Sequence, residues 1–377
     1  MNVTPTDEQA AVIRAVVAWY LDRSSPQEFY IAGYAGVGKS TVANLAIEEL
    51  TAKADVRNVV TCAYTGKAAH VLRRKGIRNA QTIHSAIYSP VEDDDGHVRF
   101  ALAPDGAAAN ADIIVLDECS MVGPEIAEDL RSFGKKILVM GDPGQLPPIK
   151  GQGVFTVRAP DAFLREIHRQ AEGSPIIRIA TMARKGERIA PGDYGDGVLV
   201  KPLTRDTQRD VYSEATQAIC GKHTVRWAYT QRIRKARGFE GRAPVEGERV
   251  ICCRNDRKLG LFNGAIGTLL DLRADRMSTD FEIDVQLDDS NSPHKDLTVN
   301  PWLFRQHFEN DLKRPRMAKG TQEFDWGYVL TCHKAQGSEW PHVTIVDDSR
   351  VFREDADRWL YTAITRAAEG LTLLQRG

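Results

Sequence analysis

The chain has 377 residues, more than one ordinary hydrophobic core supports, so two or three domains are expected. Its 50 basic and 51 acidic side chains nearly balance, which argues against a protein that coats nucleic acid with its whole surface and leaves a local basic groove as the alternative. No apolar run reaches membrane-spanning length and no signal-peptide pattern is present, so we expect a cytoplasmic, intracellular protein without membrane contact.

The six cysteines form no C-x-x-C pair. Several of them lie within apolar or strand-like runs, namely Cys62, Cys119, Cys252 and Cys332. This placement predicts buried, reduced thiols in preference to disulfides or zinc ligands.

The first predicted element is a helix that begins after Thr6. The run Thr6-Asp7-Glu8-Gln9 fits a capping box, in which the Gln9 side chain returns to the backbone of the capping residue. The alternative interpretation is that the Gln9 amide forms hydrogen bonds with an adenine base. Local sequence alone favours the capping role.

The next feature is a strand, then a glycine-rich loop, then a helix. Glu28–Ala32 has the pattern of a strand, Gly33–Ser40 fits GxxxxGK(S/T), and Thr41–Ile47 has the pattern of a helix. In this arrangement successive backbone N–H groups converge on phosphate oxygens at a helix N-terminus. Lys39 can then reach the β- and γ-phosphates while the Ser40 hydroxyl ligates Mg²⁺. The sequence therefore predicts a site for a nucleoside triphosphate, ATP with Mg²⁺, whose loop glycines are Gly33, Gly36 and Gly38.

Short apolar strands alternate with helical patterns along the chain. The candidate strands before residue 150 are Phe29–Ala32, Val59–Ala63, Ile113–Asp117 and Ile137–Met140. A second series follows, at Gly197–Lys201, Val225–Tyr229, Arg249–Cys252, Tyr328–Cys332, Val343–Asp347 and Leu371–Leu374. Nearly continuous apolar strands separated by helices imply parallel sheets covered on both faces. We therefore expect an α/β fold with two cores, joined near residues 150–190.

Two stretches interrupt this alternation. Residues 86–110 contain Asp95-Gly96 between extended segments, which is typical of a β-hairpin. Residues 241–325 carry short strand-like runs separated by turn signals, which suit a small β-barrel. We thus predict a first core over residues 1–150 that contains the hairpin, and a second core over residues 151–240 and 326–377 that is interrupted by the barrel.

Two strand ends supply candidate catalytic groups. The apolar run Ile113–Leu116 is followed by Asp117 and Glu118. Downstream of a phosphate loop, Asp117 suits a carboxylate that holds Mg²⁺, and Glu118 suits a base that orients the attacking water. In the segment Gly141–Pro148, the amide of Gln145 can lie beside the γ-phosphate.

In their order along the chain these segments resemble the motifs of superfamily-one DNA helicases, specifically the 5′→3′ branch that contains RecD-like proteins and the phage helicase Dda. The matching segments are Thr6–Gln9, Gly33–Ser40, Thr65–Ala69, Thr82–Ser85, Asp117-Glu118, Gly141–Pro148, His168–Gln170, Thr331–Glu339 and Tyr361–Arg366. Gly141–Pro148 and His333–Glu339 are the most specific of them, whereas the phosphate loop is common to many ATPases. The match spans nearly the whole chain. It implies two RecA-like P-loop cores with parallel sheets, a β-hairpin pin in the first and a small SH3-like β-barrel in the second.

The resemblance implies a role for each matching residue. In the first core the ATP contacts would be those of the phosphate loop with Gln9 and Thr41, and the catalytic residues would be Lys39, Glu118 and Gln145. Across the cleft the site would be completed by Arg169, Arg366, Gly337 and Glu339. Either arginine taken alone is more typical of a solvated surface group, and only its place among the motifs favours a catalytic role. The single-strand track would be lined by Thr65, His84, Thr331, His333 and Lys334.

Two further features have open interpretations. Phe100, in the pin hairpin, is a strand-separating wedge or a core anchor, and the sequence favours neither. The segment Trp227–Arg232 lies where related helicases often carry an Asn-rich loop, so its DNA contacts stay unassigned. A basic cluster either helps to hold a nucleic-acid backbone or forms a solvated charged face; it comprises Arg226, Arg232, Arg234, Lys235, Arg237 and Arg242.

The resemblance implies an ATP-dependent DNA helicase that moves along single-stranded DNA with 5′→3′ polarity and opens duplex DNA at junctions between single and double strands. Its grip would be on phosphates and stacked bases, because a motor must tolerate every sequence. The alternatives are a helicase that acts on RNA and a motor subunit of a larger recombination or repair complex. We expect a monomer, with replication, repair or recombination proteins as candidate partners.

Overall fold

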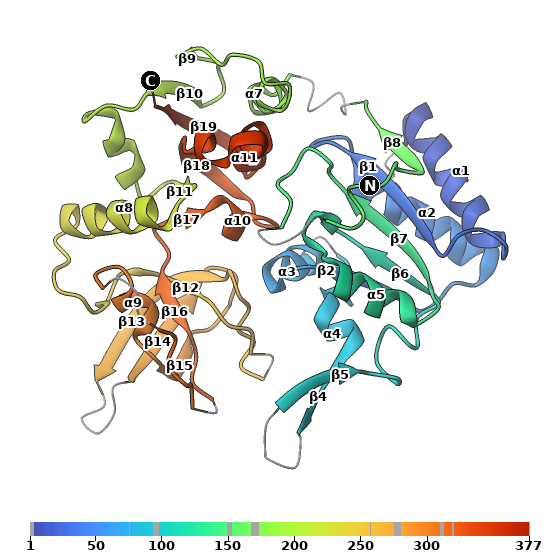
Figure 1. Ribbon diagram of the computed structural model, residues 1–377, viewed down its shortest axis with the longest axis horizontal. Coiled ribbons are helices and arrows are strands. Elements are labelled where there is room, and N and C mark those ends of the chain that lie inside the picture. The colour runs from blue at the N-terminus through green and yellow to red at the C-terminus, as the bar shows by residue number, and fades with distance from the viewer. Residues whose placement is uncertain are drawn as a thin grey trace. The chain divides into compact units, whose positions relative to one another are not determined.

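The computed structural model describes residues 4–74, 76–92, 98–148, 153–166, 173–256, 258–274, 280–309, 313–318 and 320–376. The chain falls into two compact units, Met1–Arg178 and Ile179–Gly377 (Figure 1). Each unit contains its own six-stranded sheet. In the described ranges, no helix has both the length and the apolar character needed to cross a bilayer.

The first unit is built on a sheet with the strand order β3-β2-β6-β7-β1-β8. All of its neighbouring strands pair in parallel, which confirms the prediction from their apolar runs. The strands are β1 (Glu28–Gly33), β2 (Val59–Ala63), β3 (Gln81–Thr82), β6 (Ile113–Leu116), β7 (Lys136–Gly141) and β8 (Ala162–Leu164). Because β8 pairs with β1, the first core extends beyond the predicted boundary at residue 150.

Helices cover both faces of this sheet. Side chains of β1 alternate between the faces, so that Phe29 and Ile31 pack with α1 and α2, whereas Tyr30 and Ala32 pack with α4 and α5. A strand that is buried on both faces needs an unbroken apolar run, which explains why these strands could be recognised in the sequence. The helices of this part are α1 (Asp7–Leu21), α2 (Lys39–Ala54), α3 (Gly66–Arg74), α4 (Ile83–Ile87), the 3-10 turn η1 (Cys119–Met121) and α5 (Pro124–Ser132).

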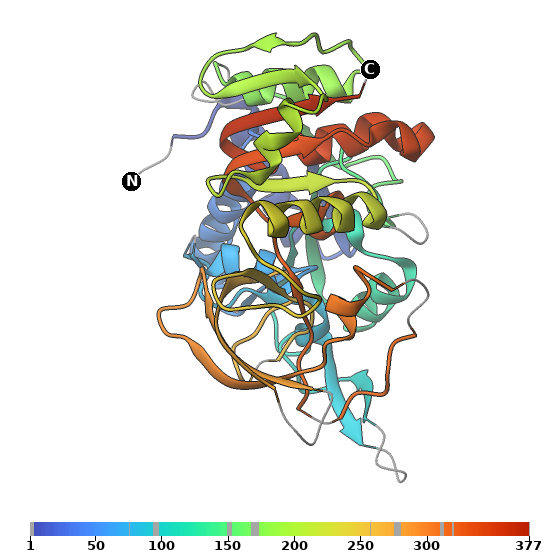
Figure 2. The same cartoon turned by 90° about the vertical axis from the view of Figure 1, so that its left-hand side faces the viewer.

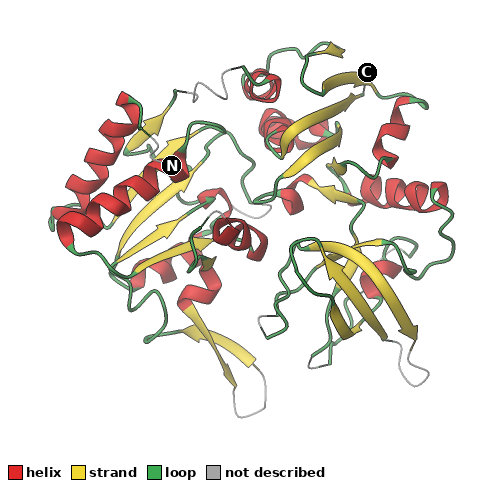
Figure 3. Cartoon of the chain, turned by 180° about the vertical axis from the view of Figure 1, so that it is seen from behind, coloured by secondary structure: helices red, strands yellow, loops and turns green. Residues whose placement is uncertain are grey.

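A β-hairpin follows α4. Strand β4 (Tyr88–Glu92) pairs antiparallel with β5 (Val98–Leu102), and Pro90 lies opposite Phe100. The two strands form a sheet of their own, which extends away from the parallel sheet of the first unit (Figures 1 and 3). The predicted turn at Asp95-Gly96 lies outside the described residues.

The second unit contains a sheet with the strand order β17-β11-β18-β19-β10-β9, in which all neighbours are parallel except β9 and β10. Its strands are β9 (Gly192–Asp193), β10 (Val198–Pro202), β11 (Gln217–Cys220), β17 (Val329–Thr331), β18 (Trp340–Val346) and β19 (Ala367–Gln375). The helices that accompany them are α7 (Pro175–Arg184), η2 (Thr207–Tyr212), α8 (His223–Ala236), α10 (Cys332–Ala335), η3 (Ser349–Asp355) and α11 (Ala356–Ile364).

One predicted strand of this unit is wrong. Val225–Tyr229 lies inside α8 instead of in the sheet. The buried side chains of α8 recur at helical spacing, at Arg226, Tyr229, Thr230, Ile233 and Arg234. Because arginines contribute to this buried stripe, the stripe does not look apolar in the sequence.

An antiparallel sheet is inserted between α8 and β17, with the strand order β15-β14-β13-β12-β16. Its elements are β12 (Arg249–Cys252), β13 (Ile266–Ala274), β14 (Phe281–Leu287), β15 (His294–Val299), α9 (Trp302–Arg305) and β16 (Phe324–Trp326). Because β16 pairs with β12, the predicted start of the second core at residue 326 falls inside this sheet. Strand β12, one of the candidate strands of the second series, belongs to the insertion and lies within its predicted bounds of residues 241–325.

The inserted sheet and the second parallel sheet share one hydrophobic core. A single buried cluster contains Val250 and Trp326 from the inserted sheet, Tyr229 from α8, and Val329 and Val346 from the parallel sheet. Helix α8 lies along this junction (Figures 1 and 2). The insertion is therefore packed against the second unit over a continuous apolar surface.

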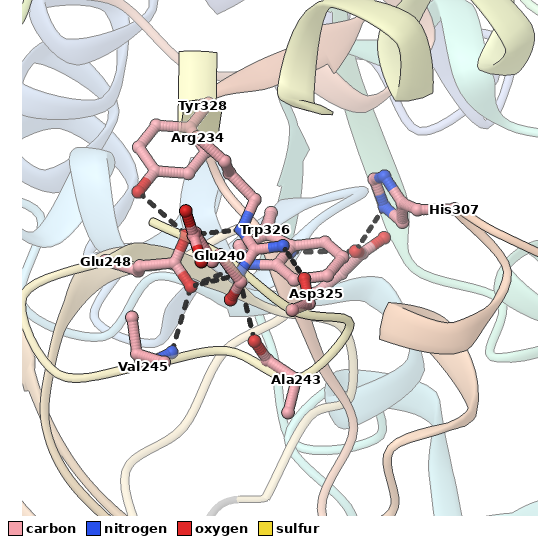
Figure 4. Close-up of polar contacts among 10 residues, drawn as sticks. Arg234, Glu240, Ala243, Val245, Glu248, His307, Asp325, Trp326 and Tyr328 are labelled. Carbon is pink, nitrogen blue, oxygen red and sulfur yellow. Dashed lines mark hydrogen bonds and ion pairs between the residues drawn. The ribbon is translucent and has the colours of Figure 1, made fainter. Parts of the chain in front are cut away.

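Two buried ion pairs also join α8 to the inserted region, and Figure 4 shows the pair between Arg234 and Glu248. Arg234 donates from Nε to Glu248 at 2.7 Å, and Arg226 pairs with Asp325, which also contacts His307. Burial alone would raise the pKa of Asp325, but Arg226 and His307 hold that pKa well below its usual range. Both arginines are 3% exposed, so for them both interpretations of the basic cluster are wrong. The cluster members that are exposed are Arg232, Lys235 and Arg242.

The six cysteines are free thiols, and all but Cys253 are buried. Burial raises the pKa of three of them to about 12, so that Cys62, Cys252 and Cys332 stay protonated at neutral pH. The prediction of buried, reduced cysteines is confirmed.

Candidate functional site

The glycine-rich loop lies between β1, which ends at Gly33, and α2, which begins at Lys39. Gly36 and Gly38 have φ angles of 82° and 80°, in the left-handed region that favours glycine. A β-carbon on Gly33 would lie 2.7 Å from Val37 Cγ2, so space also requires glycine there. No side chain caps α2, which begins after Gly38. The N–H groups of its first turn are thus suited to bind an anion.

Lys39 folds back over this loop. Its Nζ donates hydrogen bonds to the backbone oxygens of Gly33 at 2.7 Å and Tyr34 at 3.0 Å. Ser40 is the next residue in the first turn of α2. The ammonium group, the helix N-terminus and the hydroxyl group form a donor set that fits a triphosphate with Mg²⁺.

Gln9 connects helix α1 to the same loop. Its backbone N–H donates to Thr6 Oγ1 at 3.3 Å and its Oε1 accepts from the Thr6 N–H at 3.1 Å, which confirms the capping box. Its Nε2 also donates to the carbonyl oxygen of Val37 at 3.1 Å. This second contact, between residues far apart in sequence, had no signal in the local pattern. It brings Gln9 to the edge of the phosphate loop, where its predicted contact with adenine remains untested.

Asp117 and Glu118 follow β6 directly. The Asp117 N–H donates to the Cys62 carbonyl oxygen at 2.9 Å, and the Glu118 N–H donates to Asp117 Oδ1 at 2.9 Å. Glu118 has φ 53° and ψ 49°, a left-handed conformation that is rare for a residue with a β-carbon. Such strain is concentrated at functional sites, and here it turns the chain sharply after the pair of carboxylates.

Cys119 follows the two carboxylates directly, begins η1 and is buried. Burial raises the pKa of the Cys119 thiol, the charges of Glu118 and Asp117 raise it further, and Lys39 opposes them. The phosphate loop follows β1 and the two carboxylates follow β6, so both lie at the carboxyl end of the same parallel sheet. A β-carbon on Gly141 would lie 2.3 Å from Cys119 Sγ, so glycine lets β7 end close to this thiol.

The segment after β7 brings Gln145 to the same edge of the sheet. Asp142 is buried, and its Oδ1 accepts from the Gly144 N–H at 2.9 Å, while its backbone oxygen accepts from the Gln145 N–H at 3.1 Å. Asp142 thus shapes the turn that positions Gln145. Among the described residues, the buried Oε1 of Gln145 has no hydrogen-bond partner. An unsatisfied amide oxygen at this place suits a group that supports a ligand or a reacting water.

In the second unit, Arg366 lies close to the segment Gly337–Glu339. Its guanidinium donates to the backbone oxygens of Thr362 at 3.1 Å and Ser338 at 3.3 Å. Arg366 is 6% exposed, whereas Glu339 is exposed. The structure thus brings together the three residues of this unit that are expected to contact ATP. Arg169, which is also expected to contact ATP, falls within the bounds of the first unit and lies outside the described residues.

Thr65 and Thr331 have the same local arrangement in the two units. Each threonine precedes a helix, and its Oγ1 accepts a backbone hydrogen bond from the first turn, at 3.1 Å for Thr65 and 3.4 Å for Thr331. Of the other residues expected along the strand track, His84 is exposed, and His333 is half-buried. Burial lowers the pKa of His333, which keeps its imidazole neutral at pH 7.

Lys334 has an unexpected partner. Its Nζ lies 2.8 Å from the sulfur of Cys253, at the end of β12. The contact links α10 to the inserted sheet, and residues 81 positions apart in sequence give no local sign of it. As the structure stands, the Lys334 ammonium is directed to the interior of the second unit.

Phe100 is 71% exposed on β5, so the interpretation of this residue as a core anchor is wrong. Leu102, two positions further on the same strand face, is also partly exposed. The hairpin therefore presents an apolar face to solvent. The role of Phe100 as a wedge remains a prediction.

Comparison with known proteins identifies relatives over the whole chain. A family profile described as an AAA domain matches residues 4–199, and one described as a UvrD-like helicase C-terminal domain matches residues 327–374. The ATP-dependent RecD2 DNA helicase of Deinococcus radiodurans is 27% identical over 391 residues, which cover 97% of this chain and 48% of that protein. The conjugal transfer protein TraA of Agrobacterium fabrum is 26% identical over 377 residues, which cover 91% of this chain and 30% of that protein. The chain thus spans about half or less of the length of these curated relatives.

Solved structures show the same fold. The Pif1 helicase of Bacteroides bound to single-stranded DNA has a TM-score of 0.57 at 18% identity, and the alignment covers 99% of this chain and 92% of that one. Pif1 of Candida albicans has a TM-score of 0.53 at 18% identity, with 100% of this chain and 96% of that one covered. The AAA profile alone covers more than half of the sequence. The chain therefore belongs to the AAA-domain family, and a named DNA helicase is among its relatives.

Proposed function

We propose that this protein is an ATP-dependent DNA helicase that moves along single-stranded DNA in the 5′→3′ direction and separates duplex DNA where single and double strands meet. The observation that carries the proposal is that the phosphate loop with Lys39, which follows β1, and the pair Asp117 and Glu118, which follows β6, lie at the carboxyl edge of one parallel sheet. The D. radiodurans relative is named an ATP-dependent DNA helicase, and a Bacteroides Pif1 structure contains single-stranded DNA, which supports the same substrate class.

In this proposal Lys39 leaves the carbonyl groups of the loop and pairs with the phosphates of ATP. Ser40 and Asp117 hold Mg²⁺, which supplies positive charge to the phosphate oxygens when it is bound. Glu118 accepts a proton from the attacking water, and the Gln145 amide supports the γ-phosphate. The remaining first-unit contacts are those proposed for Gln9 and Thr41, at the edge of the loop and in the first turn of α2.

The second unit contributes Arg366, Gly337 and Glu339 to ATP binding and hydrolysis in the same proposal. Two backbone oxygens hold the Arg366 guanidinium beside this segment, which supports a pre-organised cation. An arginine of this kind stabilises the charge that develops on the transferred phosphoryl group. The corresponding role of Arg169 rests on the family resemblance alone.

For the nucleic acid, we propose a track lined by Thr65, His84, Thr331, His333 and Lys334. Lys334 would have to leave Cys253 to meet a phosphate. The hairpin β4–β5 would act as the strand-separating pin, with Phe100 as the wedge, and its exposed aromatic ring supports that role. The inserted sheet would be the small SH3-like barrel of this helicase branch.

The polarity and the activity are tested together on DNA duplexes that carry a single-stranded tail at either the 5′ or the 3′ end. We expect ATP-dependent unwinding of the 5′-tailed duplex only. Equal unwinding of the 3′-tailed duplex would contradict the polarity, and failure on both substrates would contradict helicase activity. Stimulation of ATP turnover by matched DNA and RNA oligonucleotides then separates a DNA motor from an RNA motor, because 2′-hydroxyl contacts decide that preference.

The ATP site is tested by Lys39→Ala. We expect this variant to lose ATP turnover while single-strand binding survives, because only the phosphate contact is removed. The matched control is Lys53→Ala, at an exposed position near the other end of α2, where the lysine pairs with Glu49. Turnover near the wild-type rate in Lys39→Ala would refute the assignment.

A further inference from the structure

Arg353, in η3, has a backbone conformation that is rare for a residue with a side chain. Its φ is 51° and its ψ is −111°, and these values interrupt η3 shortly before α11 begins. Glycine adopts such a conformation at little cost, whereas a β-carbon crowds the backbone there. An arginine at this strained position indicates a functional role for its side chain, which glycine lacks.

Packing on the preceding residue holds this conformation. The Phe352 ring stacks on Trp359, with 5.6 Å between the ring centroids, and its centroid lies 5.9 Å from that of His333. A β-carbon on Gly221 would lie 2.8 Å from Phe352 Cε2, so the ring is tightly enclosed. Phe352 is half-buried and held by these ring contacts, and the side chain of Arg353 is left on the surface, one residue away from a ring that contacts His333.

The 3-10 helix η3 carries two arginines, Arg350 and Arg353, and two acidic residues, Glu354 and Asp355. Arg350 and Arg353 are exposed, together with Val351 and Glu354. Carboxylates close to η3 are paired with other arginines, in the pairs Asp348–Arg376 and Asp355–Arg358. Within the described part of the chain, the Arg353 guanidinium makes no ion pair or hydrogen bond. The one strained residue of η3 is thus also an exposed cation whose donors are available.

We propose that Arg353 contacts a phosphate of a single-stranded nucleic acid that passes His333. This inference rests on the proposed function, because it takes His333 as part of the strand track. Phe352 connects the two residues, since its ring contacts His333 and its backbone leads into the constrained Arg353. An arginine fork binds phosphate oxygens without reading a base, which suits a motor that moves over any sequence.

The test compares Arg353→Gly and Arg353→Lys with wild type by fluorescence anisotropy of a labelled oligo(dT), over a series of salt concentrations. Glycine removes the cation and relieves the backbone, whereas lysine keeps the charge and the backbone constraint. The charge-matched control is Lys185→Ala, at an exposed position beyond α7 where the lysine pairs with Glu187. The melting temperature and the ATP turnover without DNA are measured for each variant.

For Arg353→Gly we expect the negative slope of log K against log salt to become shallower by about 0.7, which corresponds to about fivefold weaker binding at 0.1 M salt. Its melting temperature should equal or exceed that of wild type, and its basal ATP turnover should be unchanged. Arg353→Lys and Lys185→Ala should keep the wild-type slope.

Two results would overturn the inference alone: wild-type affinity and slope in Arg353→Gly, or weaker binding that accompanies a lower melting temperature. The second result would show that the arginine only packs. A wild-type chain that binds no oligonucleotide would refute the proposed function and the inference with it.

Discussion

Glu248 provides a sharp test of how the inserted region is held to α8. We predict that Glu248→Gln destabilises the second unit by about 3–5 kcal/mol, because it leaves the buried Arg234 guanidinium without a counter-charge. Glu248 is 0% and Arg234 3% exposed, so water cannot replace the lost partner. Glutamine has nearly the same shape as glutamate, so the loss would not come from a cavity.

The magnitude follows from the contacts that this carboxylate makes. Glu248 accepts from Arg234 Nε at 2.7 Å and Nη2 at 3.1 Å, from the Val245 N–H at 2.9 Å, and from Trp326 Nε1 and the Tyr328 hydroxyl, each at 3.2 Å. A glutamine amide offers one acceptor oxygen and places an NH₂ group against the remaining donors. Each buried donor that loses its acceptor costs about 1–3 kcal/mol, and more when it is charged.

Hydrogen exchange of the backbone amides of β12 and β16, followed by mass spectrometry, is the suitable assay. The chain has two units, so a single two-state unfolding transition cannot be assumed, whereas exchange reports the opening of each element. The matched control is Asp288→Asn, which removes the charge from the Arg249 pair of the same region. The side chains of that pair are 48% and 31% exposed, and the expected loss is below about 1 kcal/mol.

A loss in Glu248→Gln no larger than that in Asp288→Asn would refute the reasoning, since it would mean that the buried charge finds another partner at little cost. Arg234→Met supplies the second arm of a double-mutant cycle. The double variant should cost less than the sum of the two single variants, because the contact between them can be lost only once.

The other predictions concern the first unit. Glu118→Gln should still bind ATP but slow its turnover by about 100-fold or more, measured in single-turnover experiments, and rapid hydrolysis would exclude Glu118 as the base. Phe100→Ala should change the stability by less than about 0.5 kcal/mol because the ring is exposed. It should impair duplex unwinding more than DNA-stimulated ATP turnover, and an equal loss of both would exclude the wedge. Gly141→Ala should destabilise the unit by about 1–3 kcal/mol in thermal unfolding, because the new β-carbon overlaps Cys119 Sγ. Adding Cys119→Ala should recover most of the lost stability. A double variant as unstable as Gly141→Ala would contradict the proposed clash.

The elements that could be predicted are those whose sequence pattern matches their burial. Strands β1, β2, β6 and β7 are buried on both faces, so their apolar runs coincide with the observed strands. Strand β11 was missed because Gln217 opens it, and the partners of this buried amide include the backbone oxygens of Gly327 and Tyr328, far along the chain. The three-residue strand β8 was missed because it is too short for a period to be recognised.

Part of helix α8 was predicted as a strand. The run Val225–Tyr229 is rich in residues that favour strands, whereas the buried face of the helix includes Arg226 and Arg234. Pattern analysis treats arginine as a surface residue, but here partners supplied by the inserted region neutralise both side chains. A buried charge can be recognised only when its partner is known, and that partner lies far along the chain.

In the candidate site, too, local motifs could be predicted, whereas contacts between distant segments could not. The phosphate loop and the residues Asp117, Glu118 and Gln145 are local motifs at the ends of strands, and parallel topology brings such ends to one edge of a sheet. The contacts of Gln9 with the loop and of Lys334 with Cys253 depend on packing between distant segments. No local pattern encodes them.

The common core beneath α8 has a consequence for protein engineering. An insertion with a separate hydrophobic core could be deleted and replaced by a short linker. Here removal of the insertion would take away the packing neighbours of Tyr229, Val329 and Val346 and expose a hydrophobic surface to water. A truncated version would therefore be expected to aggregate, and exchange of this region between relatives would need α8 to travel with it.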